Sequence, residues 1–377
     1  MTIINVSSVA ELYKAVNDIN NAGNKIVLAA GKYELNPNDP EVGNFLGRLE
    51  LQEDMELEGQ PGDPGLVTID ESQLPINSFT VPPSFRTGGI RLGRGSNAIR
   101  WLTIIGKPDI GALSAIDTDL PSAKCIITIS NIIVSGSQLA IDIRNPGFAG
   151  KNRVIKASIE KCELKNNVVG GGQGISVQNA NGADNCEINV TLKDNHIHHN
   201  NVGIRSWNLG GISSTTNASI KIKSEADRIV DNGIGLILNA GNSNTTNSVA
   251  LDNDLSFEAH GTKIENNDGV PAPLDKNLPL CQVFAAGGNS TAAANKASNN
   301  KLEIKIWGTQ VSGGQPFDIS IFGARYVNPI PTGTDIAGLD NVAKIHLHGV
   351  STKAKIESAA SIPNEPAGTN KVIVITN

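Results

Sequence analysis

Short segments in which apolar and polar residues alternate recur along most of the chain. They are GGIRL at 88–92, AIDIR at 140–144, GISV at 174–177, GIRSW at 203–207, GLIL at 235–238, CQVF at 281–284 and DISIF at 318–322. Alternation with a period of two is typical of half-buried β-strands, and glycine or asparagine between such segments indicates tight turns. The pattern therefore predicts an all-β protein made of many short strands.

A repeated frame connects these strands. In four copies, an apolar residue is followed three positions later by an asparagine. The pairs are Leu164 and Asn167, Ile197 and Asn200, Ile229 and Asn232, and Ile264 and Asn267. The copies are spaced by roughly 30 to 35 residues, a period typical of solenoids, whereas propeller blades need longer repeats. We expect stacked coils around one continuous core, with the asparagines hydrogen-bonded to one another along the stack.

The N-terminal segment differs from the repeats and predicts a helix. Its apolar residues Val9, Leu12, Val16 and Ile19 fall on one helical face, and SSVAE at 7–11 contains a capping-box pattern. A helix with one apolar stripe is well suited to cover the open end of a β-stack.

The C-terminal segment is less regular. YVNPIPTGTDIAG at 326–338 predicts a loop, and KIHLHG at 344–349 and KVIVIT at 371–376 predict closing strands. We expect a single domain over 1–377, with a cap at 1–24, coils over 25–325, and a loop with closing strands over 326–377.

Composition narrows the class of partners. Charged residues make up 18% of the chain, aromatic residues 4%, and the net charge is −6 without a basic run, so we expect no nucleic-acid partner. No apolar run reaches membrane-spanning length, and we expect no membrane association. Met1 is not followed by a leader pattern, which leaves the location open between the cytoplasm and secretion with the leader removed. The four cysteines show no close pair, and we expect buried thiols; the oligomeric state is left open.

The frame N-x-G-I-x-V, recurring at this period behind an N-terminal helix, resembles the right-handed parallel β-helix proteins of the pectate-lyase-like superfamily. The resemblance covers roughly residues 20 to 325 and implies an all-β, right-handed parallel β-helix of about ten coils with a short capping helix. It also implies a polysaccharide or oligosaccharide partner, because proteins of that superfamily are mostly lyases, hydrolases or epimerases of polysaccharides. Others are binding or structural modules, so the fold alone assigns no activity.

Three of the six histidines fall within KDNHIHHNN at 193–201. The repeat places His196 and His198 on the outer side of a strand, in positions that other copies fill with unrelated charged residues, and His199 in a polar turn. No cysteine or carboxylate stands at an obvious ligand spacing, so we expect surface residues and no metal site. His198 is retained as a candidate substrate-binding residue.

The following strand carries the candidate site. With Ile204 and Ser206 inward, Arg205 and Trp207 point outward, and stacked strands lie about 4.8 Å apart. The same alternation predicts two outer columns, one of Asp142, Ser176 and Arg205 and one of Arg144, Gln178 and Trp207, continued by Ile237 and Asn239, then Gln282 and Phe284, then Ser320 and Phe322. Arg91 belongs to an earlier coil.

Arginine can form two hydrogen bonds with a carboxylate, and tryptophan can stack on a sugar or on arginine. We therefore expect Arg205, Arg144 and Asp142 as candidate catalytic residues, and Trp207, Gln178, Ser176, Arg91 and His198 as candidate substrate-binding residues.

Four function classes are compared against these residues. β-Elimination on a uronate needs a cation that neutralises the carboxylate and a base that takes the C5 proton, which Arg144 and Arg205 are placed to supply. Glycoside hydrolysis needs two carboxylates within about 10 Å, whereas Asp142 and Asp318 are expected some five coils apart. The loop carboxylates Asp117, Asp119 and Glu265 keep hydrolysis open. We expect a polysaccharide lyase, without a cofactor and without the calcium-binding carboxylates usual in the superfamily. The sequence leaves open a non-catalytic glycan- or protein-binding β-helix, and an intracellular isomerase or cyclase.

Overall fold

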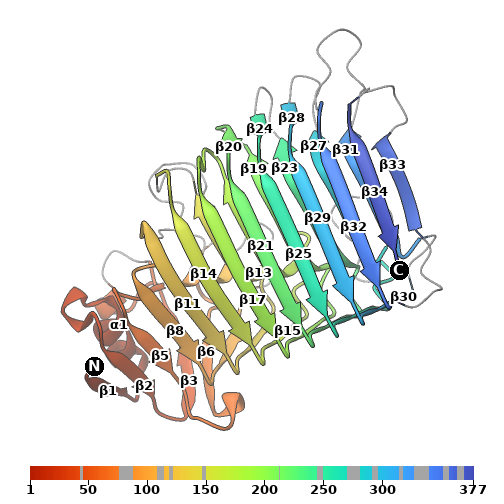
Figure 1. Cartoon of the computed structure of the whole chain (residues 1–377). Helices are drawn as coiled ribbons and strands as arrows, with labels where there is room; N and C mark the ends of the chain where they lie inside the picture. The colour runs from red at the N-terminus through yellow and green to blue at the C-terminus, as the bar shows by residue number, and fades with distance from the viewer. Residues whose placement is uncertain are drawn as a thin grey trace.

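The strands wind into a right-handed parallel β-helix. The computed structural model describes residues 1–42, 46–75, 88–107, 114–118, 122–146, 150–211, 213–243, 249–269, 281–290, 296–313, 317–326, 339–350, 356–362 and 369–377. Between residues 25 and 326 the chain visits three long parallel sheets in turn and adds one strand to each sheet per coil (Figure 1). This architecture confirms the predicted fold class.

The sheets are named A, B and C. Sheet A has twelve strands: β1 (Ile3–Val6), β2 (Lys25–Leu28), β5 (Glu56–Glu58), β8 (Ser96–Arg100), β11 (Lys124–Ser130), β14 (Val154–Glu160), β17 (Glu187–Lys193), β21 (Ser219–Glu225), β25 (Asp254–His260), β29 (Lys301–Trp307), β32 (Val342–His348) and β34 (Lys371–Thr376). Sheet B has nine strands: β3 (Gly31–Glu34), β6 (Val67–Asp70), β9 (Thr103–Ile105), β12 (Ile133–Ser135), β15 (Glu163–Lys165), β18 (His196–His198), β22 (Arg228–Val230), β26 (Lys263–Glu265) and β30 (Gln310–Ser312).

Sheet C has ten strands: β4 (Leu49–Glu50), β7 (Gly88–Arg91), β10 (Ser114–Asp117), β13 (Leu139–Pro146), β16 (Gln173–Ala180), β19 (Val202–Gly210), β23 (Ile234–Ser243), β27 (Val283–Ser290), β31 (Ile319–Tyr326) and β33 (Ile356–Ile362). A small fourth sheet contains β20 (Thr215–Thr216), β24 (Val249–Leu251) and β28 (Lys296–Ser298). The helical elements are α1 (Val9–Asn17) and the 3₁₀ turns η1 (Ile19–Asn21), η2 (Pro40–Val42) and η3 (Pro64–Leu66).

The core is a set of stacked aliphatic columns. Sheet B contributes the four apolar residues of the repeated frame, Leu164, Ile197, Ile229 and Ile264, all fully buried. Because each parallel strand repeats the position of its neighbour, side chains of one kind stack along the whole length of the helix. Burial of these columns drives the stacking of the coils.

The predicted asparagine ladder is present at the bend between sheets B and C. The side-chain amide of Asn167 donates to the oxygen of Asn200 at 2.8 Å, Asn200 to Asn232 at 3.0 Å, and Asn232 to Asn267 at 2.9 Å. Each of these oxygens also accepts the backbone N–H of the asparagine before it. The ladder therefore satisfies buried polar groups that the turn would otherwise leave without partners.

The residue before each ladder asparagine has a left-handed backbone. Its φ is 57° at Asn166, 54° at His199, 55° at Asp231 and 55° at Asn266. Asparagine, aspartate and histidine tolerate this conformation better than most residues. His199 is therefore a turn residue, as its place in the repeat predicts.

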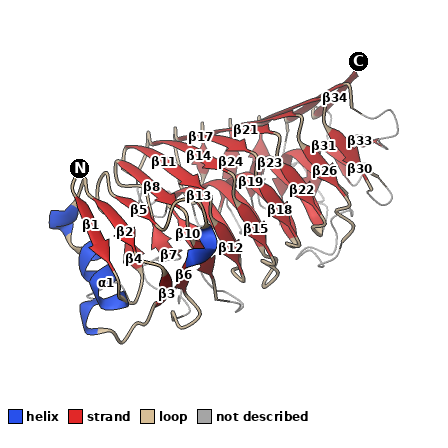
Figure 2. Cartoon of the chain, turned by 90° about the horizontal axis from the view of Figure 1, so that it is seen from below, coloured by secondary structure: helices blue, strands red, loops and turns tan. Residues whose placement is uncertain are grey.

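The N-terminal helix is confirmed, with one correction. Helix α1 lies at the N-terminal end of the stack, beside β1 and β2 (Figure 2). It buries Leu12 and Val16, and its N-cap Ser8 accepts the backbone N–H of Glu11 at 3.3 Å. The prediction for Ile19 was wrong: its side chain is 72% exposed, because the helix ends at Asn17 and Ile19 begins a separate turn. Tyr13 of the helix is buried, and its hydroxyl donates to the Gly47 carbonyl at 2.9 Å.

A second correction concerns β27. Ile237 aligns with Phe284 and Asn239 with Ala286, so the predicted placement of Gln282 and Phe284 was wrong by two residues. Ser320 and Phe322 lie in the predicted columns. Gln282 instead ends the asparagine ladder and accepts the amide of Asn267 at 2.6 Å. The 15 positions between Asn267 and Gln282, against two between Asn232 and the start of β23, remove the spacing that sets the register in the earlier coils.

Both predicted closing strands are present. β32 and β34 extend sheet A, and β33 extends sheet C, while residues 327–338 of the predicted loop lie outside the described residues. The division into cap, coils and closing segment remains a prediction.

All four cysteines are buried thiols, and among the described residues no helix is long and apolar enough to span a membrane.

Replacing Asn232 by alanine is expected to lower the free energy of unfolding by about 2 to 4 kcal/mol, because fully buried partners lose their hydrogen bonds. Asn189→Ala is the matched control, since its amide only contacts Glu187 on the partly exposed outer side of sheet A. Urea-unfolding midpoints compare the two. Equal midpoints for both variants would contradict a structural ladder.

Candidate functional site

The two predicted columns exist on the outer side of sheet C. Asp142 aligns with Ser176 and Ser176 with Arg205, while Arg144 aligns with Gln178 and Gln178 with Trp207. These six residues are called the Arg205 face. They come from three consecutive coils and are brought together because parallel strands stack in register.

A chain of hydrogen bonds joins three members of the face. The indole N–H of Trp207 donates to Gln178 Oε1 at 2.9 Å, and the amide of Gln178 donates to Asp142 Oδ1 at 2.9 Å and Oδ2 at 3.2 Å. Ser176 lies beside this chain, with its hydroxyl 3.4 Å from the Gln178 amide nitrogen. The chain fixes the orientation of the tryptophan relative to a buried carboxylate.

The cations of the face have different surroundings. The Arg205 guanidinium lies over the Trp207 ring, 3.4 Å from its centre. The Arg144 Nε lies 3.5 Å from Asp142 Oδ2, and its Nη2 lies 3.9 Å from Asp117 Oδ2. Arg144, Arg205 and Trp207 are half-buried, so a ligand can reach them.

Asp142 is outward in register but fully buried. Burial raises the pKa of its carboxyl above the usual 3.8, against the opposing effects of Arg144 and Gln178, and the charge of Asp117 raises it further. Gln178 and Ser176 are also buried on the outer side. Position on the outer side of a strand therefore does not mean exposure to solvent here.

The face continues into an ion cluster that the sequence analysis missed. Asp117 lies directly beside Asp142 on the neighbouring strand, and Arg91 lies beside Asp117. Arg91 Nη1 is 3.0 Å from Glu50 Oε2, its Nε is 3.9 Å from Asp117 Oδ1, and all three side chains are almost completely buried. Arg91 thus belongs to a buried cluster, next to the groups that a ligand can reach.

The position of Asp117 corrects the argument against hydrolysis. Asp117 was assigned to a loop and Asp142 was paired with the distant Asp318, whereas the structure places Asp117 on β10, next to Asp142. The signal was present in the sequence: SAID at 114–117 repeats the AID of LAID at 139–142. Asp119 lies outside the described residues.

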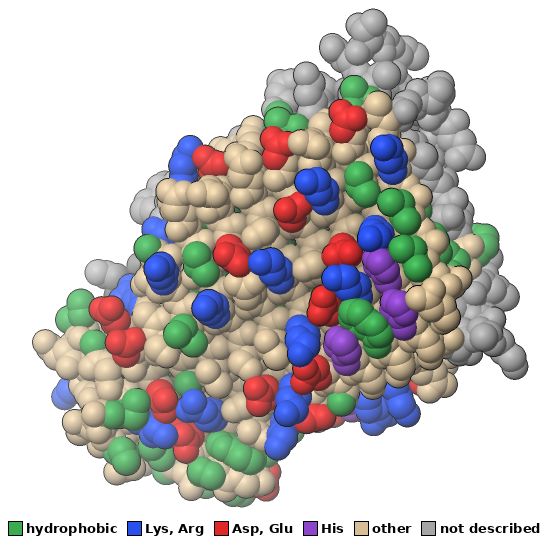
Figure 3. All heavy atoms as spheres, in the orientation of Figure 1, with side chains coloured by type: hydrophobic (Ala, Val, Ile, Leu, Met, Phe, Trp, Pro, Cys, Tyr) green, Lys and Arg blue, Asp and Glu red, His purple; other side chains and the backbone are tan. Residues whose placement is uncertain are grey.

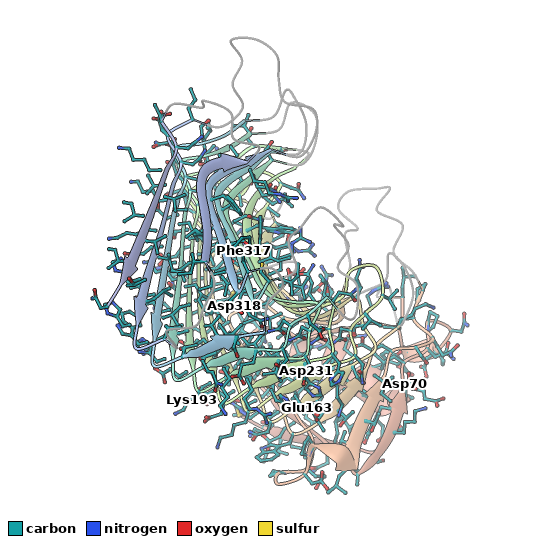
Figure 4. The ribbon with its side chains drawn as sticks, turned by 90° about the vertical axis from the view of Figure 1, so that its right-hand side faces the viewer. Asp70, Glu163, Lys193, Asp231, Phe317 and Asp318 are labelled. Carbon is teal, nitrogen blue, oxygen red and sulfur yellow. The ribbon has the colours of Figure 1, made fainter. Side chains whose placement is uncertain are left out.

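His198 is not part of the Arg205 face. It lies on β18 in sheet B, across the asparagine bend from β19 in sheet C. The rings of His196 and His198 stack with centres 4.0 Å apart, and His198 Nε2 is 3.2 Å from Glu163 Oε1. Glu163 belongs to the coil before β18 and Asp231 to the coil after it (Figure 4). No carboxylate stands at a ligand spacing along the chain, and Glu163 reaches His198 from the neighbouring strand instead.

Both histidines have a pKa below the usual 6.5. Burial and the neighbouring His198 lower the pKa of His196 to about 4. Burial also lowers the pKa of His198, with Glu163 acting in the opposite direction.

The outer side of sheet A carries a second surface feature. A groove of about 650 Å³ crosses its strands, and Figure 3 shows acidic and basic side chains interspersed over this side of the molecule. Three of its lining residues are acidic and three are basic: Glu187, Asp254, Glu303, Lys221, Lys301 and Lys344. With opposite charges in equal number, the groove has no preference for an anionic ligand.

Comparisons with known proteins give low similarities. No family model and no curated protein matches the chain. Among solved structures, it is similar to the A-module of mannuronan C-5 epimerase AlgE6 from Azotobacter vinelandii, with a TM-score of 0.32 and 12% identity over 98% of this chain and 95% of that one. The AlgE4 A-module of the same organism gives 0.27 and 13% over 93% and 95%. The PL6 family alginate lyase AlyGC gives 0.23 and 11% over 100% and 75%. TM-scores this low carry no argument about activity.

The raised pKa of Asp142 predicts how the stability of the protein depends on pH. The folded pKa lies above the unfolded value of 3.8, so the folded state favours the protonated carboxyl. Its contribution to stability is complete below pH 3.8 and is lost as pH rises through the folded pKa. Asp142→Asn should therefore gain stability relative to the wild type between about pH 4 and pH 7.

Asp184→Asn is the control of opposite sign. Lys151 and Thr216 lower the pKa of Asp184, so the wild-type carboxylate stabilises the fold above pH 3.8, and the variant should lose relative stability as pH rises. Urea midpoints across this range measure both. The same slope for the two variants would show that Asp142 is not a disfavoured buried charge.

Proposed function

We propose that the chain is a carbohydrate-active protein that binds a uronate-containing polysaccharide on the Arg205 face and cleaves it by β-elimination. The observation that supports this proposal is the grouping of two arginines and a tryptophan within three consecutive coils, with Trp207 held by Gln178. Guanidinium groups recognise carboxylates, and an indole ring stacks on a sugar. A polymer lying along the helix axis would meet these groups one after another.

The arginines serve this reaction as cations. In β-elimination a base removes the proton at C5, the electron pair forms the C4–C5 double bond, and the glycosidic oxygen leaves from C4 and takes a proton. Arg205 and Arg144 would neutralise the carboxylate, which stabilises the negative charge that develops beside it. Stacking over Trp207 favours the protonated guanidinium, so Arg205 fits this role better than that of the base.

Asp142 is the member of the face best suited to accept the proton. Its raised pKa makes its carboxylate a stronger base than an ordinary aspartate, and Arg144 and Gln178 orient it. Because Asp142 is buried, the substrate must displace the side chains above it before the proton can move.

Non-catalytic glycan binding is the second candidate. The observation that favours it is the complete burial of Asp142 and Asp117, which leaves cations and an aromatic ring, without a carboxylate, as the reachable members of the face. Experiment separates these possibilities by the product. Elimination leaves an unsaturated uronate that absorbs ultraviolet light, hydrolysis by the two carboxylates leaves none, and binding alone leaves the polymer intact.

Arg205→Ala should weaken binding of uronate polymers at least about tenfold, because a charge-assisted contact to carboxylate is lost. Arg100→Ala is the matched control: Arg100 pairs with Glu56 at 2.9 Å on sheet A and lies outside the face. Affinity electrophoresis or calorimetry with polygalacturonate and alginate measures the effect, and added salt should weaken wild-type binding.

An equal effect of the two substitutions would reject the Arg205 face as the binding site. Wild-type binding without an ultraviolet-absorbing product would reject elimination and leave the binding module, whereas new reducing ends without that product would indicate hydrolysis.

A further inference from the structure

We propose that Glu163, His196 and His198 form a binding site for a divalent transition metal ion such as Zn²⁺ on the outer side of sheet B. The site lies on a different sheet from the Arg205 face and does not depend on the proposed carbohydrate activity. In the part of the chain that the structure describes, this is the one group of three possible ligand residues whose ligand atoms all lie within 4.8 Å of one another.

The β-helix itself brings the three side chains together. His196 and His198 are two residues apart on β18 and so point to the same side, with their rings stacked at 4.0 Å. Glu163 lies opposite His196 on the neighbouring strand, and its Oε1 reaches diagonally to within 3.2 Å of His198 Nε2. The side chains of His198 and Glu163 are 13% and 32% exposed, so an ion can enter from solvent.

The donor set selects the class of metal. Two imidazole nitrogens and one carboxylate oxygen suit Zn²⁺ and neighbouring transition metals, and a coordination position is left for water. Calcium and magnesium prefer sets made only of oxygen atoms. We therefore expect discrimination against Ca²⁺ at this site.

His199 gives His198 the hydrogen-bond partner that ligating histidines usually have. The two Nδ1 atoms lie 2.7 Å apart. When His198 Nδ1–H donates to His199 Nδ1, the lone pair of His198 Nε2 faces Glu163 and is available to the metal. The left-handed turn at His199 sets this contact, so His199 is a positioning residue.

Two nearby cations oppose metal binding. Lys165 Nζ lies 2.9 Å from Glu163 Oε1, and Arg228 stands beside His196 in the next strand. A metal ion must share or replace the Lys165 contact with the carboxylate. Removing the lysine charge should therefore strengthen binding.

The chain contains a matched control pair. His346 and His348 have the same H-x-H spacing on β32, and His346 Nε2 lies 3.4 Å from Glu303 Oε1. Their ring centres are 6.2 Å apart, however, and His348 stacks on Trp307. These residues form no group of converging ligand atoms among the described residues.

The test is calorimetric titration of the full chain with Zn²⁺, together with the visible absorption spectrum of bound Co²⁺. The wild type should bind one equivalent, and His198→Ala, His196→Ala and Glu163→Gln should lose it, while the double variant His346→Ala/His348→Ala keeps it. Lys165→Gln should bind more tightly. His199→Asn, which suits the left-handed turn, should bind about 10- to 100-fold more weakly with the Co²⁺ spectrum retained.

Melting curves without metal serve as the folding control, because all three ligands are partly exposed and their replacement should leave the melting temperature unchanged. The proposal is overturned if the wild type binds no saturable equivalent, if His198→Ala still binds it, or if the control double variant loses it to the same extent. Saturation by Ca²⁺ at the same affinity would also overturn it.

Discussion

The register of the coils depends on buried side-chain amides that bond to one another along the helix axis. At the bend between sheets B and C, Asn200 and Asn232 each accept two N–H groups from the coil before and donate to the next member of the ladder. A second ladder of Asn253, Asn300, Asn341 and Asn370 repeats the arrangement near the start of the sheet A strands. Aliphatic columns alone would tolerate a coil that slips, whereas a slipped coil would leave these buried amides without partners.

This register determines which residues lie side by side on the surface. Residues about 30 positions apart become neighbours, so single polar residues from successive coils form the Arg205 face on sheet C and the histidine–glutamate group on sheet B. The two surfaces are separated by the asparagine bend, because His198 precedes Asn200 and Arg205 follows it. A change in one surface therefore leaves the backbone of the other in place, provided that the ladder is intact.

Much of this arrangement follows from the sequence. The repeated asparagine predicts the bend, and the residue before it predicts a polar turn. Strand alternation predicts the columns Asp142–Ser176–Arg205 and Arg144–Gln178–Trp207. Prediction failed where the repeat is interrupted. A long segment separates Asn267 from Gln282 and β27, and Asp117 lies on a coil without a ladder asparagine.

Some features have no local signal at all. Asp142 is outward by strand alternation and is nevertheless buried, because burial depends on what lies above the face in three dimensions. Glu163 became a partner of His198 through a diagonal contact between strands, which depends on side-chain conformation as well as on register. Position in the repeat thus predicts neighbours, while exposure and pKa require the folded structure.

The structure of the protein with a bound uronate oligosaccharide tests most directly whether the Arg205 face is the functional surface. The expected result is a sugar chain over β13, β16 and β19, with a uronate carboxylate on Arg144 or Arg205 and a ring against Trp207. An oligosaccharide in the groove on sheet A, with the Arg205 face unchanged, would contradict it.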